Sequence, residues 1–233
     1  MFLHHPIEPA PPRKKEKWLI EVTDYGFGCR PAVFAPLLGN GIFTQEGIAW
    51  KHSRELLRKQ FVRAQYQNLD SSFSEHFDNL VGCIPSDGVV DLQPLFFSFT
   101  LDTATALLFG HSVYSLRADI DQGIENRAFA ENFNIAQEGL AKRFRLAPFH
   151  FVYNPPKFRK ACKSVHQFVE KYIEDLGLMK DHKAKGESTG DSASWFIEQV
   201  ATESSSTSEL RDQLLNVLLA GRDTTACCLS WTL

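Results

Sequence analysis

Residues 206–233 read STSELRDQLLNVLLAGRDTTACCLSWTL, and this stretch decides the fold class. Ser206 and Glu209 stand at capping-box spacing, which predicts that a helix begins here. The residues that follow are apolar nearly all round the helix, so we expect neighbours on every side of it. Long helical patterns also follow one another through the rest of the chain, with almost no alternating, strand-like segments. The sequence therefore predicts a mainly α fold.

The composition excludes several classes of protein. With 233 residues and 43% hydrophobic side chains, the chain can build one large domain or two small ones around a real core. The 25 basic and 28 acidic side chains leave a formal charge of -3, which argues against a protein that coats nucleic acid. The five cysteines are scattered and odd in number, so they indicate neither a disulfide framework nor a metal-binding knuckle.

The chain divides into a leader and one helical domain. Residues 1–24 begin with histidines and prolines and lack the apolar centre of a secretory signal, so we expect a disordered leader. Residues 25–233 form the domain, with a surface linker at 183–192 that is rich in Lys, Gly, Ser and Thr. No apolar run approaches the roughly 18 residues of a membrane span, because Asp102 divides the richest stretch.

Helix start and stop signals place the other main elements. Residues 26–47 are rich in Gly and Pro and are expected to be a loop. Capping residues, prolines and apolar stripes then predict helices at 48–63, from Asp91 to Gly110, from Pro155 to Gly177 and around 195–200.

The last helix contains a polar interruption. Gly221 costs roughly 1 kcal/mol relative to alanine, and the Thr224 hydroxyl can bond back to the carbonyl of Ala220. The side chains of Ala220, Thr224 and Cys228 share one face, and Asp223 lies beside it. A small ligand lying flat on that face would meet one hydroxyl and one carboxyl. The alternative is a buried helix that tolerates a glycine and a few satisfied polar groups.

The helix at 48–63 carries a second candidate site. Trp50 and Arg54 are four residues apart, and their indole N–H and guanidinium together suit a carboxylate or a phosphate. The same helix has a local charge near +4, which could dock an acidic partner, from Lys51, Arg54, Arg58, Lys59 and Arg63 against Glu55. The alternative is a basic helix that is merely solvated.

Two motifs in order resemble the cytochrome P-450 superfamily. Leu38-Gly39-Asn40-Gly41-Ile42-Phe43, followed by Trp50, Arg54 and Phe61, looks like the C-helix signature, and residues 220–226 look like the I-helix signature. Asp91-Leu92-Gln93, residues 99–103 and Asn216 are similar to the fungal alkane and fatty-acid hydroxylases within it. The likeness covers roughly residues 25–233 and implies a partial fold, from the B–C region to the I helix, without the N-terminal sheet, the K helix and the Cys-ligand loop.

The resemblance implies a haem-thiolate monooxygenase that hydroxylates long aliphatic substrates with dioxygen and reductase-supplied electrons. Trp50 and Arg54 match the pair that holds the haem propionates. Ala220 and Gly221 match the surface over the haem where dioxygen sits. Asp223 and Thr224 match the carboxyl and hydroxyl that deliver protons to dioxygen.

The same resemblance implies partners and a location. The basic helix, with Lys51, Arg58 and Lys59, would dock an NADPH-cytochrome reductase. The segment from Phe144 to Tyr153 would line the entry of a hydrophobic substrate, although core packing is the alternative for its aromatic side chains. The full-length family implies the endoplasmic reticulum membrane.

The cysteines depart from the family pattern. The family presents its iron ligand in a Phe-x-x-Gly-x-Arg-x-Cys loop, a pattern that none of the five cysteines fits. Cys227 and Cys228 lie within the last helix itself, and the other three have different neighbours. We therefore assign no metal ligand and expect the chain alone to be inactive. A non-enzymatic helical domain that binds a lipid or another hydrophobic ligand is the alternative.

Overall fold

The computed structural model describes residues 26–63, 69–86, 88–117, 123–183 and 195–233. The expected leader and all but the first residue of the expected linker lie outside these ranges. The described residues form helices joined by short turns, and they contain no strand. The helices are α2 (Arg30–Leu38), α3 (Gly47–Arg63), α4 (Leu69–Gly82), α5 (Leu92–Phe109), α6 (Gly123–Leu146), the short 3-10 helix η1 (Ala147–Val152), α7 (Pro156–Lys183), α8 (Trp195–Glu203) and α9 (Thr207–Thr232). The expected mainly α fold is confirmed.

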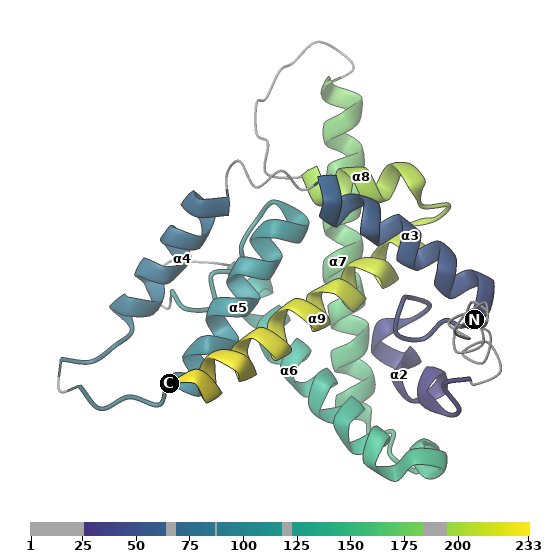
Figure 1. The fold of residues 1–233 in the computed structure, drawn as a ribbon, viewed down its shortest axis with the longest axis horizontal. Coiled ribbons are helices and arrows are strands. Elements are labelled where there is room, and N and C mark those ends of the chain that lie inside the picture. Colours follow the sequence, from purple (N-terminus) through teal and green to yellow (C-terminus); the bar gives the residue numbers. More distant parts are fainter. Residues whose placement is uncertain (1–25, 64–68, 87, 118–122, 184–194) are drawn as a thin grey trace, which may run out of the picture.

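Helix α9 crosses the middle of the molecule (Figure 1). It packs along α5 and contacts α7, α2 and α8, while α6 packs on α7 and α4 packs on α5. The main hydrophobic core joins leucines of α2, α3 and α9 to aromatic and β-branched residues of α6 and α7, among them Leu38, Leu56, Leu214, Leu218, Phe129, Phe133, Phe158 and Val165. Because these side chains are almost fully buried, removing apolar surface from water is the main force that holds α9 in place.

Local capping signals predicted the helix ends well. Asp91 caps α5 by accepting a hydrogen bond from the Gln93 N–H at 3.1 Å, and Gly110 ends the helix in the left-handed conformation with φ 73°. At the start of α9 the Ser206 hydroxyl accepts from the Glu209 N–H at 3.2 Å, while the Glu209 carboxylate accepts from the Ser205 N–H at 2.9 Å. The predicted end at Gly177 is wrong, because α7 continues to Lys183.

Helix α2 lies where the sequence predicted a loop. Its nine residues begin with Pro31 in the first turn, where a missing N–H costs nothing, and contain Pro36 in the interior. Pro36 has no N–H to donate to the carbonyl of Ala32, and the Nη2 of Arg143 donates to that carbonyl instead, at 3.1 Å. An arginine more than a hundred residues away therefore replaces the donor that the proline lacks.

Only the first half of α9 is buried as the sequence predicted. Leu210, Leu214, Leu215 and Leu218 are at most 3% exposed. In the second half, however, Gly221, Thr224, Thr225, Cys227 and Cys228 are exposed. The prediction of neighbours on every side is therefore wrong for this half, because one face of the helix stays open in the described structure.

Helix α5 corrects the expectation that no stretch is long and apolar enough to cross a membrane. Its 18 residues have a mean hydropathy of 1.2, which meets that test by length and composition alone. Asp102 is fully buried in this helix and accepts hydrogen bonds from the N–H groups of Ser115 and Leu116, at 2.6 and 3.1 Å. With α9 along one side and α4 against another, α5 is a core helix of this fold.

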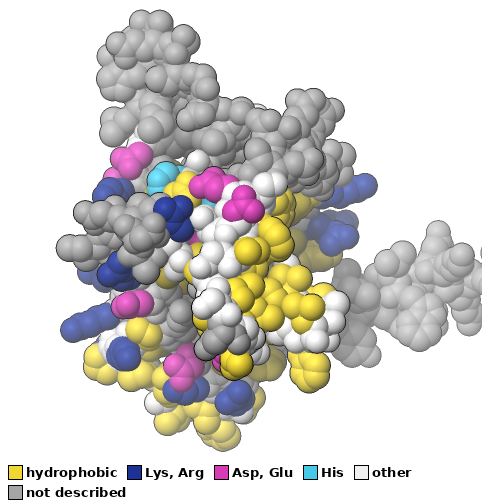
Figure 2. Space-filling model, turned by 90° about the vertical axis from the view of Figure 1, so that its left-hand side faces the viewer, with side chains coloured by type: hydrophobic (Ala, Val, Ile, Leu, Met, Phe, Trp, Pro, Cys, Tyr) yellow, Lys and Arg dark blue, Asp and Glu magenta, His cyan; other side chains and the backbone are white. Residues whose placement is uncertain are grey.

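Apolar side chains are also exposed along α4. Phe73, Phe77 and Val81 follow one another at helical spacing and are 43%, 55% and 48% exposed. Figure 2 faces the side of the molecule where α4 and the end of α9 lie, and it shows hydrophobic side chains gathered there. Leu80 follows Phe73 by seven residues and is buried at the edge of this row, where it joins Phe96 of α5 and Ala226 of α9 in a second, smaller core.

The loop between α2 and α3 is held on α9 by side chains of α9. The Asp212 carboxylate accepts from the Asn40 N–H at 2.8 Å, and the Asn216 carbonyl oxygen accepts from the Phe43 N–H at 2.9 Å. The Asn216 amide nitrogen donates to the carbonyl of Leu38 at 2.9 Å and to that of Asp212 at 2.7 Å. Asn216 thus fixes the chain just before α3, which carries Trp50 and Arg54.

Replacing Asn216 by alanine should destabilise the chain by about 3 kcal/mol. The substitution removes three hydrogen bonds of a fully buried side chain, at about 1 kcal/mol each, and it leaves the Phe43 N–H and the Leu38 carbonyl without these partners. Urea unfolding followed by circular dichroism measures the loss. Thr225→Ala, on an exposed position of the same helix, is the matched control and should change the free energy of unfolding by less than about 0.5 kcal/mol. Equal effects of the two substitutions would contradict the account.

Candidate functional site

The open face of α9 has the local structure that its sequence predicted. The Thr224 hydroxyl donates to the carbonyl of Ala220 at 2.6 Å, which confirms the expected back-bond. Thr224 and Cys228 are exposed, and Ala220 is half-buried. A methyl group added at Gly221 would meet only the Cβ of Ala104, at 3.9 Å. The face is therefore lined by small side chains and has room for a flat group.

Asp223 lies beside this face and is tied to α6. Its Oδ1 accepts from Nη1 of Arg222 at 3.1 Å, and its Oδ2 accepts from the side-chain amide of Gln137. Burial raises the pKa of the Asp223 carboxyl, while Arg222 and Gln137 act in the opposite direction. The side chain remains 37% exposed, so the carboxyl can still exchange protons with solvent.

Arg222 and Gln137 were missed by the sequence analysis. Arg222 is 5% exposed, and its guanidinium carbon lies 5.1 Å and 5.5 Å from the ring centroids of Phe97 and Phe133. Burial lowers the pKa of the Arg222 guanidinium. No local pattern marks these residues, because their partners come from helices that are about ninety residues apart in the sequence.

Trp50 and Arg54 form the second candidate group, on α3. The Arg54 guanidinium carbon lies 5.4 Å from the centroid of the Trp50 ring, so the two side chains lie together on one face of the helix, as their spacing of four residues predicted. Arg54 is exposed and Trp50 is half-buried. Within the part of the chain that the structure describes, neither donor group has a hydrogen-bond or ion-pair partner.

Helices α3 and α9 meet at their first halves. The Gln213 amide nitrogen donates to the Ser53 hydroxyl at 2.5 Å, and Ser53 in turn donates to the Gln45 side chain. His52 lies 3.8 Å from Glu209. Gln213 precedes Gly221 by about two turns of helix. The structure therefore brings the two candidate groups onto connected helices, and among the described residues no hydrogen bond or ion pair joins Trp50 or Arg54 to residues 220–225.

The aromatic segment that covers the end of α6 and η1 is exposed. Phe144, Phe149 and Phe151 are 57%, 63% and 65% exposed, and Val152 is 71% exposed. Tyr153 is half-buried and packs near Phe158, with ring centroids 6.2 Å apart. The alternative of core packing is therefore wrong for the three phenylalanines.

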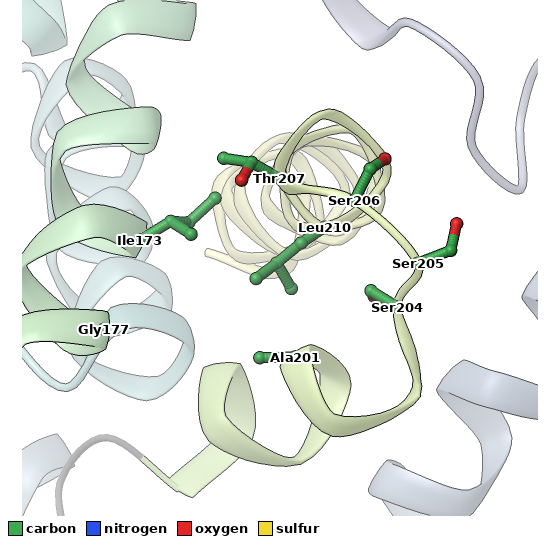
Figure 3. Close-up of a pocket in the computed structure, with 8 residues that line it drawn as sticks. All are labelled: Ile173, Gly177, Ala201, Ser204, Ser205, Ser206, Thr207 and Leu210. Carbon is green, nitrogen blue, oxygen red and sulfur yellow. The ribbon is translucent and has the colours of Figure 1, made fainter. Parts of the chain in front are cut away.

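A pocket lies elsewhere, where α7, α8 and the start of α9 meet (Figure 3). Its apolar side is formed by Ile173, Ala201 and Leu210, which face one another in the close-up. The Ser205 and Ser206 hydroxyls at its rim serve the capping of α9, through the Glu209 carboxylate and the Glu209 N–H. The capping of α9 therefore accounts for these two hydroxyls.

The residues of the two candidate groups fit a haem by the chemistry of their donors. The unpartnered indole and guanidinium of α3 suit the two propionates, and the open small-residue face of α9 suits the flat ring. The described residues contain no group of three His, Cys, Asp or Glu side chains that could hold a metal ion. The fit therefore concerns the propionates and one face of the ring, and it leaves the ligand of the iron unassigned.

The cysteines of the chain are unsuited to be that ligand. Burial raises the pKa of the Cys162 thiol to about 12, so it stays protonated. Cys83 donates through its sulfur to the carbonyl of Leu116, at 3.3 Å. Cys227 and Cys228 are exposed on α9 itself, and Cys29 is exposed at the start of α2.

The sequence is similar to known proteins along nearly its whole described length. The model of the family Cytochrome P450 matches residues 26–233. A protein called Cytochrome P450 from Arthroderma benhamiae is 44% identical over 195 residues, which is 84% of this chain and 39% of the relative. Cytochrome P450 52A13 of Debaryomyces hansenii is 41% identical over 97% of this chain and 44% of the relative. Cytochrome P450 52A8 of Candida tropicalis is 40% identical over 91% and 42%. The chain thus spans less than half the length of these curated relatives.

Proposed function

Because this chain belongs to the cytochrome P450 family, we propose that it forms one wall of the haem site of a monooxygenase. The observation that carries the proposal is the open, small-residue face of α9, with the Thr224 hydroxyl on it and the Asp223 carboxyl beside it. When bound, haem supplies the iron at which dioxygen is activated. The substrate class that we propose is a long aliphatic molecule, an alkane or a fatty acid, in keeping with the similarity to the 52A13 and 52A8 relatives.

The residues of α3 and α9 take separate roles in this proposal. Trp50 and Arg54 bind the propionates through charge-assisted hydrogen bonds. Ala220 and Gly221 leave room for dioxygen because their side chains are small. Thr224 keeps its hydroxyl fixed on the Ala220 carbonyl, so an oxygen lone pair stays free to accept a hydrogen bond. Asp223 takes up protons from solvent and passes them toward that hydroxyl.

The exposed basic side chains of α3 are the proposed contact of an NADPH-cytochrome reductase. Lys51, Arg58 and Lys59 are exposed, and Lys59 forms an ion pair with Glu203 at 2.8 Å. A cluster of like charges on one helix attracts an acidic partner and speeds its association at low ionic strength. For the full-length protein we propose the endoplasmic reticulum membrane, and we propose no nucleic-acid partner, in keeping with the charge of -3.

A second candidate function is a non-enzymatic helical domain that binds a lipid or another hydrophobic ligand. The specific observation in its favour is the exposed cluster of Phe149, Phe151 and Val152. Such a domain would bind fatty acid without haem, whereas the monooxygenase proposal requires haem to bind first.

Haem titration of the purified chain, followed by its absorption, tests the proposed function. We expect haem to bind, and we expect Arg54→Gln to weaken its binding about tenfold, since one charge-assisted hydrogen bond to a propionate is lost. The carbon monoxide difference spectrum of this chain should lack a thiolate-type band, because none of the five cysteines stands in the Phe-x-x-Gly-x-Arg-x-Cys pattern. For the same reason the chain alone should be inactive.

Arg58→Gln is the matched control for this titration. Arg58 is exposed on the same helix one turn after Arg54, and its loss removes the same charge. Equal haem affinity of the Arg54→Gln and Arg58→Gln variants would refute the role of Arg54. A chain that binds fatty acid and no haem would favour the second candidate function.

A further inference from the structure

The side chain of Gln137, on α6, touches both charged groups that precede Thr224 on α9. Its amide nitrogen donates to Oδ2 of Asp223, and its amide oxygen accepts from Nη1 of Arg222. The same Nη1 donates to Oδ1 of Asp223 at 3.1 Å. The three side chains therefore form a closed ring of hydrogen bonds, in which Gln137 is the neutral member that comes from another helix.

Arg222 is the most firmly held side chain of this ring. It is 5% exposed, and its guanidinium carbon lies 5.1 Å from the ring centroid of Phe97, on α5, and 5.5 Å from that of Phe133, on α6. Its Nη2 donates to the side-chain oxygen of Asn134, which precedes Gln137 by three residues on the same face of α6. A planar guanidinium held at both ends of its fork has little freedom to turn. Gln137 is thereby anchored on a rigid group.

Both oxygens of the Asp223 carboxyl accept hydrogen bonds in this arrangement, Oδ1 from Arg222 of α9 itself and Oδ2 from Gln137 of α6. Asp223 and Thr224 are consecutive, so their side chains leave α9 about 100° apart. A carboxyl that is held by Gln137 lies beside the open face of α9 rather than on it. To reach the Thr224 hydroxyl, it must first give up the bond from the Gln137 amide.

We propose that Gln137 is a positioning residue for Asp223: its side-chain amide, anchored on Arg222, sets the orientation of the carboxyl and controls when it turns toward the Thr224 hydroxyl. This inference rests on the proposed function, in which Asp223 carries protons to that hydroxyl. It assigns a role to α6 that lies outside the two motifs of α3 and α9.

The charge environment gives the inference a measurable consequence. Among the described residues the charged group that faces Asp223 is Arg222, from α9 itself, and the group that faces it from α6 is the neutral Gln137. Burial raises the pKa of Asp223, and the hydrogen bond from Gln137 lowers it. Removing the amide should therefore raise the pKa of Asp223 further.

The test is a pH titration of the Asp223 carboxyl carbon by NMR, in the haem-free chain with ¹³C-labelled aspartate and with Asp223→Asn to assign the signal. Gln137→Met keeps the length of the side chain and removes the amide, and it should raise the midpoint by about one pH unit, a tenfold change in proton affinity. Gln137→Glu keeps the shape and places a second carboxyl against Asp223, so it should raise the midpoint by at least as much. It also serves as the second variant if Gln137→Met fails to fold.

Asn134→Leu is the matched control. It removes one hydrogen bond of Arg222 and leaves both bonds of Asp223, so the midpoint should move by less than about 0.3 pH units. A similar loss of stability in Asn134→Leu and Gln137→Met, with a shifted midpoint in Gln137→Met alone, supports positioning. An unchanged midpoint in both Gln137 variants, or equal shifts in the Gln137→Met and Asn134→Leu variants, overturns it. Because the titration uses no haem, its failure removes the role of Gln137 alone, whereas failure of haem binding removes the proposed function.

Discussion

Replacing Arg143 by methionine should destabilise the chain by about 5 kcal/mol, the largest effect that we expect from a single substitution. Arg143 is 6% exposed in the last turn of α6. Its Nε donates to the carbonyl of Val33 at 3.1 Å and its Nη2 to that of Ala32, while Nη1 donates to the carbonyls of His150 and Tyr153 at 3.2 and 3.0 Å. Methionine removes these four hydrogen bonds, at about 1 kcal/mol each. It also leaves the Ala32 carbonyl with no donor, because Pro36 has no N–H, whereas the His150 carbonyl keeps the bond from the Tyr153 N–H.

The loss should be concentrated in α2, because Arg143 supplies a hydrogen-bond donor that the backbone of this helix lacks. Pro36 offers no N–H to the carbonyl of Ala32, so the guanidinium is the donor that this carbonyl has. Arg143→Lys should recover little of the stability, since one ammonium group has no planar fork to reach carbonyls on both α2 and η1. Urea unfolding measures the total loss, and hydrogen exchange should show that the amides of α2 lose protection first.

Arg145→Met is the matched control for this substitution. Arg145 lies two residues further along the same helix, is exposed, and has no hydrogen-bond or ion-pair partner among the described residues. Its replacement should change the free energy of unfolding by less than about 0.5 kcal/mol. If both arginine variants unfold at the same urea concentration as the unsubstituted chain, the bridging role of Arg143 is refuted.

The helices could be predicted where their ends are set by neighbours in the sequence. Asp91 and Gly110 bound α5 because capping depends on groups within one turn, and Ser206 opens α9 for the same reason. Helix α2 was missed because its interior Pro36 is tolerated through Arg143, and no local pattern reports a partner 111 residues away. The exposure of the second half of α9 was missed because periodicity reports which residues are apolar and not which helices are present to cover them.

The candidate site was also predictable only where it depends on neighbours in the sequence. The back-bond of Thr224 and the shared helix face of Trp50 and Arg54 follow from helical spacing, and both are present in the structure. The sequence does not mark Gln137 as a site residue. A glutamine that bridges two helices and a glutamine that faces solvent look the same in the sequence of an amphipathic helix. Whether Asp223 and Thr224 move protons, and whether Trp50, Arg54, Ala220 and Gly221 hold haem, stay predictions for the titrations proposed above.

Replacing Gly39 by alanine should cost about 4 kcal/mol and should disturb the start of α3 as well. Gly39 has φ 54° and ψ -136°, a conformation that side chains disfavour by about 1–3 kcal/mol. A Cβ at this position would also lie 2.1 Å from an oxygen of the Asp212 carboxylate, so either the loop or α9 must move. The same carboxylate accepts from the Asn40 N–H, which means that the clash breaks a contact that joins the loop to α9.

Gly47→Ala separates the two causes. Gly47 has φ 57°, and nothing lies within 4 Å of an added Cβ, so alanine there meets the conformational cost without a clash. We expect a loss of about 1–2 kcal/mol for Gly47→Ala and a clearly larger loss for Gly39→Ala, measured by urea unfolding. Haem affinity should fall in Gly39→Ala, because the loop that is displaced leads directly into Trp50 and Arg54. Equal losses of stability in the two variants would show that α9 yields to the added methyl group, and that the close approach of Gly39 to Asp212 does not fix the position of α3.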